Sequence, residues 1–263
     1  MTAHVVIFFA ALVTSGVTLY SGFGLGTLLL PVYALFCPPE VAVASTALVH
    51  GANNLFKLIA VGRHADRGLV LRFGLPAVVA AFAGALALGY VAHFGAVASY
   101  TVGGRAAVVT PVKLAMAGLM AAFALLELLP GLKGLRFDRK YLFVGGLLSG
   151  FFGGFSGHQG ALRAAFLAKV GVSAQAYVGT NAVIGFLVDM TRIAAYAAVF
   201  ATAGGVGIGG GGQWPLVATG VAAAFLGVIL ARRYLHKATM GAVQALAGVF
   251  LLGTALALGL GLI

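Results

Sequence analysis

A polar interruption inside a long apolar run carries the side chains best suited to bind an anion. The segment reads Phe155-Ser156-Gly157-His158-Gln159-Gly160-Ala161-Leu162-Arg163. If a short helix begins near Gln159, its free N–H groups and its dipole attract negative charge, and the glycines let a ligand approach the backbone closely. Arg163 lies one helical turn later and adds a fork of donors. We therefore expect an anion site lined by Gly157, His158, Gln159, Gly160 and Arg163.

A matching interruption lies near the start of the chain, at Ser21-Gly22-Phe23-Gly24-Leu25-Gly26. Shifting the sequence along itself by 134 positions places Thr46 on Thr180 without a gap. A repeat with an interrupted hydrophobic segment at the same place in each half is typical of transporter binding sites. Glycines also serve close helix packing in membranes, so both interpretations are open. The residues that this interruption adds to the expected site are Gly22, Gly24 and Gly26.

Four basic residues lie within apolar segments: Lys57, Lys113, Arg163 and Arg192. An ionisable group at membrane depth is costly, and it is a functional candidate for that reason. Asp189 lies three residues before Arg192, so Arg192 either binds substrate or forms an internal ion pair with Asp189. Lys57 lies near the end of its segment, where it either takes part in coupling or an ion pair, or extends its ammonium group to the membrane surface.

Neutral polar side chains gather on the segments that follow the two interruptions: Thr46, His50, Asn53, Asn54, Thr180 and Asn181. Thr46, His50 and Asn53 have the i, i+4, i+7 spacing of one helix face, and Asn54 lies at the edge of that face. These groups either line the pocket or form hydrogen bonds between helices. His158 either carries a coupled proton, because histidine titrates near neutral pH, or only donates a hydrogen bond to substrate.

The composition is that of an integral membrane protein: 62% of the residues are hydrophobic and 8% are charged. Soluble domains have about 25% charged residues. The net charge of +11 is explained by basic residues that mark the cytoplasmic side, so we expect no nucleic-acid partner. Cys37 is the only cysteine, which excludes an intrachain disulfide and a cysteine metal site, and we expect no metal or other cofactor. The first residues lack the Lys or Arg of a signal peptide, so Ala3 to Tyr20 is expected to be retained.

We expect an all-α polytopic membrane protein, with residues 1–263 forming a single transmembrane domain. The predicted segments are an interrupted run from Ala3 to Phe36, spans Val41–Val61, Val70–Ala92 with a kink at Pro76, and Ala106–Leu129, then a second interrupted run from Tyr141 to Val170, and spans Ala174–Ala201, Pro215–Ala231 and Thr239–Leu262. Loops are expected at His93–Arg105 and Gly204–Gly212. Each interrupted run is predicted to be a broken or re-entrant helical hairpin, because its arms are too short to cross the bilayer alone.

Charge placement favours these hairpins over single crossings. With two hairpins, eleven of the sixteen Lys and Arg residues fall on one side of the membrane, which the positive-inside rule makes cytoplasmic. Single crossings would instead separate the Arg232 cluster from the other basic clusters. Each half then has five membrane segments, so residues 1–130 and 141–263 form an inverted repeat. Both termini are predicted to be periplasmic.

The glycine segments and their spacing resemble those of the sulfite exporter TauE/SafE family. The matching features are Gly22-Phe-Gly-Leu-Gly26 running on to Pro31, and Gly153-Gly-Phe-Ser-Gly-His-Gln-Gly160, each followed by an Ala-x-x-Ser/Gly-Thr motif that ends at Thr46 or Thr180. The resemblance implies a bacterial inner-membrane permease that exports sulfite or related organosulfur anions. We expect alternating access around a midplane anion site, with the bilayer, a coupled proton and a second copy in a homodimer as further partners.

Two alternatives remain open from the sequence. A passive anion channel would share the positive site but would not need two alternately exposed gates. A rhomboid-type intramembrane serine protease would use Ser156 of Gly154-Phe155-Ser156-Gly157 as its nucleophile, and it needs a histidine base within hydrogen-bond reach. His236 lies in a basic loop, and His50 would reverse the usual order. No Walker motif is present, so ATP drive would need a partner protein.

Overall fold

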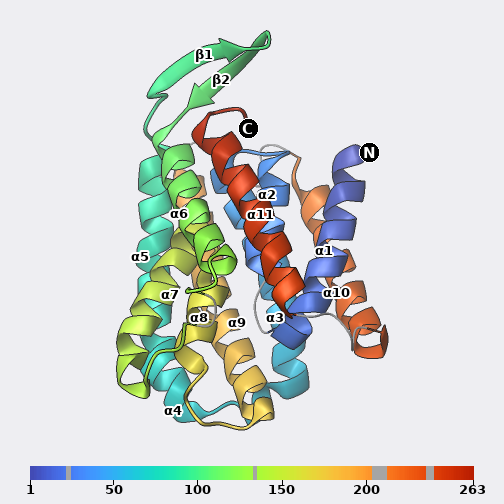
Figure 1. The fold of residues 1–263 in the computed structure, drawn as a ribbon, viewed down its shortest axis with the longest axis vertical. Coiled ribbons are helices and arrows are strands. Elements are labelled where there is room, and N and C mark those ends of the chain that lie inside the picture. Colours follow the sequence, from blue (N-terminus) through green and yellow to red (C-terminus); the bar gives the residue numbers. More distant parts are fainter. Residues whose placement is uncertain (22–24, 133–134, 203–211, 235–239) are drawn as a thin grey trace.

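The computed structural model describes residues 1–21, 25–132, 135–202, 212–234 and 240–263 (Figure 1). Side chains are described throughout these ranges except at 19–21, 105, 200, 202, 232–234 and 240–244. The predicted loop Gly204–Gly212 lies outside the described residues apart from Gly212. The same holds for His236 and Lys237 of the predicted basic loop.

Helices form most of the described chain, and the predicted all-α polytopic fold is confirmed. The helices of the first half are α1 (Thr2–Ser21), α2 (Leu25–Ala34), α3 (Pro39–Val61), the short α4 (Arg67–Leu69), α5 (Leu75–Ala92) and α6 (Pro111–Leu128). Those of the second half are α7 (Leu142–Ser156), α8 (Gln159–Leu167), α9 (Ala174–Thr202), α10 (Trp214–Tyr234) and α11 (Met240–Gly259). Short 3-10 turns occupy Gly62–His64 and Arg139–Tyr141.

Four stretches of the described chain are long and apolar enough to cross a membrane. They are Arg67–Ala92, Pro111–Leu128, Ala174–Val199 and Trp214–Ala231. Helix α3 has 23 residues and is long enough as well. Its hydropathy is lowered by buried polar side chains, so this helix is better suited to the protein interior than to contact with lipid.

The second interrupted run is broken where the glycines predict, whereas Gly22, Phe23 and Gly24 of the first run lie outside the described residues. Helix α7 ends at Ser156 because Gly157 adopts a left-handed conformation with φ of +78°, and its N–H donates to the carbonyl of Gly153. Helix α8 begins two residues later. The arms α2 and α8 have 10 and 9 residues, which is about 15 Å of helix and half of the hydrocarbon core.

The segment before α6 differs from the expectation. The prediction that a helix begins at Ala106 is wrong, because Arg105–Val109 forms strand β2, paired antiparallel with β1 (Ala98–Val102). Gly103 and Gly104 have φ of +56° and +79° and close a two-residue hairpin turn, which requires left-handed residues at both positions. The β-branched Val108 and Val109 favour the strand, and Pro111 is suited to a helix start.

The irregularity expected at Pro76 lies just before it. Residues Val70–Gly74 form one π-helical turn that leads into α5, and Pro76 occupies the first turn of α5. Proline cannot donate the backbone hydrogen bond that a regular helix would need at this point, and the wider turn accommodates the loss.

Glycines on α7 let its backbone lie directly against α5 and the turn that precedes it. A β-carbon at any of three glycines, spaced four residues apart, would overlap a backbone carbonyl of the partner. The pairs are Gly146 with Phe73, Gly150 with Ala77 and Gly154 with Ala81. Small residues at this spacing are the usual means of close helix packing in membranes. Helix α1 packs along α10, where a β-carbon on Gly227 would overlap the carbonyl of Leu12.

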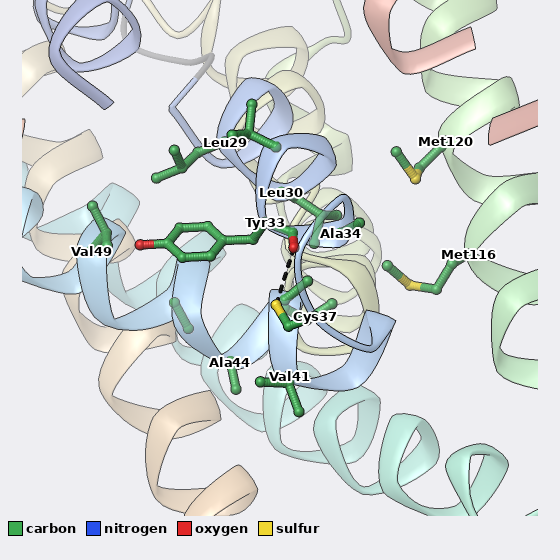
Figure 2. Packing of buried hydrophobic residues seen from close by; sticks show 14 of the residues in the cluster. Leu29, Leu30, Tyr33, Ala34, Cys37, Val41, Ala44, Val49, Met116 and Met120 are labelled. Atoms are coloured by element: carbon green, nitrogen blue, oxygen red, sulfur yellow. Dashed lines mark hydrogen bonds between the residues drawn. The ribbon is translucent and has the colours of Figure 1, made fainter. Parts of the chain in front are cut away.

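Helix α2 is buried along its whole length and is surrounded by other helices. Figure 2 shows Leu29, Leu30 and Tyr33 of α2 packed against α3, with Met116 and Met120 of α6 opposite. The hydroxyl of Tyr33 donates to the carbonyl of Leu216 on α10 at 3.0 Å. In the turn after α2, the thiol of Cys37 donates to the Tyr33 carbonyl at 3.0 Å, and burial raises the pKa of Cys37 to about 12.

The two ends of the molecule are distinct. Both termini lie at the end that carries β1 and β2, and α4 lies at the opposite end (Figure 1). Helix α3 begins at the β1–β2 end, where Glu40 interacts electrostatically with Lys113 of α6. Helix α9 begins at the α4 end, where the hydroxyl of Thr180 accepts a hydrogen bond from the N–H of Asp66 at 2.9 Å. The two short arms therefore return to opposite ends of the molecule.

The close packing of α5 and α7 predicts that Gly150→Ala destabilises the protein. The added methyl group would meet the Ala77 carbonyl, and overpacking of this kind costs about 1–3 kcal/mol. The midpoint of thermal unfolding in detergent measures the effect. Gly253→Ala on α11 is the matched control, because nothing lies within 4 Å of a β-carbon there. An equal response of the two variants would contradict the backbone contact.

Candidate functional site

The start of α2 meets the break between α7 and α8 inside the protein. A β-carbon on Gly26, at the start of α2, would lie 3.0 Å from the carbonyl oxygen of Gly157 and 4.0 Å from Cδ2 of His50. This contact tolerates little more than a hydrogen atom at position 26. The structure therefore brings together the starts of both short arms, beside α3. Gly160 lies in the first turn of α8, and the expected contributions of Gly22 and Gly24 lie outside the described residues.

A buried carboxylate is the centre of the polar network next to these breaks. Asp189 on α9 has no exposed surface. Its Oδ2 accepts from Nδ1 of His50 at 2.7 Å and from Nδ2 of Asn54 at 2.8 Å. Its Oδ1 accepts from Nε2 of Gln159 at 2.9 Å and from Nε of Arg192 at 3.0 Å. A charge in an apolar interior is tolerated only when it is paired in this way, and the network joins α3, α8 and α9.

The sequence left two roles open for Arg192, and the structure shows the internal ion pair. Its Nη2 lies 2.8 Å from Oδ1 of Asp189, three residues earlier in the same helix. Its Nη1 donates to the carbonyl of Gly153 at 3.1 Å, at the end of α7. The hydroxyl of Tyr196, one turn later, donates to the carbonyl of Gly154. These contacts hold α9 against the end of α7.

Arg163 and Lys57 face a separate small chamber of about 20 Å³. The chamber is lined by Thr18, Asn54, Lys57, Arg163, Val178, Asn181 and Ala182. Nε of Arg163 donates to Oδ1 of Asn181 at 2.8 Å, and Nη1 donates to Oε1 of Gln159 at 3.1 Å. Nζ of Lys57 lies 3.5 Å from the carbonyl of Thr18 on α1. Within the described part of the chain, neither cation contacts a carboxylate.

Gln159 connects the carboxylate to the chamber. Its amide nitrogen donates to Asp189, so its amide oxygen faces Arg163 and accepts from that guanidinium. Its backbone carbonyl accepts from the hydroxyl of Ser149 on α7 at 3.0 Å. Sequence reasoning did not identify Ser149, although it aligns with Ser15 under the 134-residue shift.

Among the described residues, several buried polar atoms near this network have no hydrogen-bond partner. Both side-chain polar atoms of Asn53 are among them, and so are the hydroxyl of Thr46 and Nε2 of His158. Buried polar groups are nearly always paired in native proteins, so such exceptions often mark functional positions. Thr180 differs from Thr46, because it bonds the backbone of Asp66 near the α4 end and lies apart from the helix breaks.

His158 and Ser156 are hydrogen-bonded to each other, which bears on the protease alternative. Nδ1 of His158 lies 3.1 Å from Oγ of Ser156, and the serine hydroxyl donates to the carbonyl of Phe152 at 3.0 Å. The histidine ring stacks on Phe123 of α6 at a centroid distance of 4.8 Å. Both Ser156 and His158 have no exposed surface. The hydroxyl proton is thus directed to a backbone carbonyl rather than to the imidazole, and a peptide has no access to the serine.

A second, larger cavity of about 430 Å³ lies on the other side of α8. Ala161, Leu162 and Ala165 face this cavity, whereas Arg163 faces the chamber. On α9, Tyr177 lines the larger cavity and Val178 lines the chamber. The short arm α8 is therefore the partition between the two spaces.

Comparison with known proteins identifies one family. A family model described as "Sulfite exporter TauE/SafE" matches residues 7–258, which is nearly the whole chain. No curated protein and no solved structure matches it.

The unpartnered amide of Asn53 predicts that Asn53→Leu stabilises the folded protein. Leucine has a similar size and removes a buried group whose missing hydrogen bonds cost about 1–3 kcal/mol. The thermal unfolding midpoint should rise. Asn181→Leu is the control and should lower the midpoint, because Asn181 bonds both Arg163 and the Tyr177 carbonyl. Destabilisation by both variants would mean that Asn53 has a polar partner.

Proposed function

The chain belongs to the sulfite exporter TauE/SafE family, and on this premise we propose that it is a secondary transporter exporting sulfite or a related small organosulfur anion. The family consists of transporters and not of enzymes, so the chain is a multi-pass membrane permease and the protease alternative is set aside. The substrate, the direction of transport and the mechanism of alternating access are parts of the proposal.

The observation that carries this proposal is an excess of buried positive charge. Lys57, Arg163 and Arg192 are each more than nine-tenths buried. In the described part of the chain, Asp189 is the one carboxylate that contacts any of them. Unneutralised cations at membrane depth are costly, so a core built in this way favours a bound anion. Arg163 is the cation best placed to bind it, because it lies next to the helix breaks and has a planar fork of donors.

We also propose that residues 1–130 and 141–263 form an inverted repeat. The 134-residue shift that aligns the glycine segments also relates Leu25, the first residue of α2, to Gln159, the first residue of α8. In this repeat, α1 is equivalent to α7 and α10 is equivalent to α5. The contact between α1 and α10 therefore has an equivalent contact between α7 and α5, and both contacts are present. The two arms return to opposite ends of the molecule. This arrangement suits alternating access by movement of one half against the other.

The proposed orientation places the α4 end in the cytoplasm and both termini in the periplasm of a bacterial inner membrane. Arg72, Arg139 and Lys140 line one surface cavity beside α5 and α7, although Arg72 and Lys140 are far apart in the sequence. A concentration of basic residues is typical of the cytoplasmic face. Proton coupling and a homodimer stay predictions.

Closure of the site favours a carrier over a channel. Arg163 is 2% exposed and Lys57 is 8% exposed, and a conducting pore would leave its binding groups open to water. Helix α8 also separates their chamber from the larger cavity. A carrier needs barriers of this kind on alternating sides of its site.

The carrier proposal predicts accelerated counterflow. Labelled sulfite should accumulate transiently in proteoliposomes that are preloaded with unlabelled sulfite, because the same site returns loaded in both directions. Protein-free liposomes are the control. Uptake that only equilibrates, with no overshoot, would favour the channel alternative.

The position of Arg163 predicts that Arg163→Ala weakens substrate binding. Charge-assisted hydrogen bonds contribute about 1.5–3 kcal/mol, so the affinity should fall by about 10- to 100-fold. Thermal shift of the purified protein with sulfite, sulfate, thiosulfate and small sulfonates measures this. Arg163→Lys should recover part of the affinity, because it restores the charge without the fork. Arg67→Ala, on the exposed surface, is the control. Unchanged affinity in Arg163→Ala would refute the assigned role.

A further inference from the structure

Lys57 is the second buried cation at the chamber that Arg163 lines. It lies on α3, two turns after His50, with its ammonium group turned toward α1 rather than toward the membrane surface. Its hydrogen bond to the Thr18 carbonyl is long at 3.5 Å. No carboxylate of the described residues lies within ion-pair distance of it. Burying an ammonium group without a carboxylate partner costs free energy, and extending the side chain to water would avoid this cost. The Lys57 side chain nevertheless remains more than nine-tenths buried.

Arg163 meets Lys57 at the same chamber from the opposite half of the chain. A guanidinium has five N–H donors, and hydrogen bonds within the described residues use its Nε and one hydrogen on Nη1. Three donors are therefore available to a ligand. Asn181 and Gln159 fix the orientation of the guanidinium plane, since each accepts from a different nitrogen of it.

The chamber is formed where the two halves meet. Thr18 and Lys57 belong to α1 and α3, whereas Arg163 and Asn181 belong to α8 and α9. A ligand bound between the two cations would therefore join the halves and neutralise a charge on each. The chamber volume of about 20 Å³ corresponds to about one water molecule. An oxyanion of four or more heavy atoms thus requires α8 to move away from α3.

We propose that Lys57 and Arg163 together form a binding site for a doubly charged oxyanion. Resting on the proposed transport function, this inference names the charge class of the substrate. A dianion neutralises both cations, whereas a monoanion leaves one cation unpaired in the membrane interior, which is costly. The site selects by charge, and Lys57 is the residue that sets the preference.

Sulfate and methanesulfonate provide a matched pair of probes. Both have a tetrahedral sulfur, but a methyl group replaces one oxygen in methanesulfonate and reduces the charge from two to one. Wild-type protein in detergent should be stabilised more by sulfate. In Lys57→Met the affinity for sulfate should fall about 30-fold or more. This is the lower end of the affinity losses found when one member of a buried charge pair is truncated. The affinity for methanesulfonate should be unchanged.

Lys57→Arg should keep the preference for sulfate, because it keeps the second charge. Lys113→Met is the control, since Lys113 donates to the Val108 carbonyl at the other end of the molecule, and it should bind both anions as the wild type does. The unfolding midpoint without ligand shows that each variant is folded, and Lys57→Gln replaces Lys57→Met if the latter is not.

Equal losses for both anions, or no loss for either, would overturn the role of Lys57. These outcomes differ from failure of the transport proposal itself. If folded wild-type protein responds to neither probe nor to sulfite and thiosulfate, and shows no sulfite counterflow, then the proposed function fails together with the dianion site.

Discussion

The buried carboxylate of Asp189 is the interaction on which the polar core depends. An ionised carboxylate in an apolar interior costs several kcal/mol unless it is fully paired. Here four side chains donate to its two oxygens, from α3, α8 and α9. This single group therefore sets the position of a short helical arm relative to two long helices. Asp189 also orients the Gln159 side chain. Because the amide nitrogen of Gln159 donates to Asp189, the amide oxygen of Gln159 faces Arg163 and accepts a hydrogen bond from it.

The buried cations differ in their contacts with Asp189. Arg192 neutralises Asp189 and holds the end of α7. Arg163 and Lys57 interact with Asp189 only at longer range, without an ion-pair contact, and they line one chamber between the two halves. Among the described residues the three buried cations outnumber the two buried carboxylates, Asp189 and Glu127, and this excess supports the proposed anion site.

Glycine residues have two separate uses in the glycine-rich segments. On α7, Gly146, Gly150 and Gly154 allow backbone contact with α5 and the residues before it. At the breaks, Gly157 supplies the left-handed turn and Gly26 admits the Gly157 carbonyl at close range. The packing interpretation therefore holds on α7, whereas the anion site at the breaks stays a prediction. The two groups of glycines differ in what they contact. The glycines of α7 face another helix, whereas Gly26 faces the carbonyl of Gly157 at the start of the other short arm.

Local sequence patterns were sufficient to predict the helical membrane fold, the break after Ser156, the family and most members of the polar core. Their physical basis is local: hydropathy determines spans, glycine determines breaks, and an i, i+3 pair such as Asp189 and Arg192 lies on one helix face by geometry alone. The strand at Arg105–Val109 was missed because a hydrophobic run leading into Pro111 does not distinguish a short strand from a helix start. The inverted repeat and the binding roles of individual residues stay predictions.

Only the tertiary structure decided which polar groups are paired. The contacts of His50 with Asp189, and of Lys57 with the Arg163 chamber, join residues more than one hundred positions apart, and such contacts depend on how helices pack rather than on any spacing along the chain.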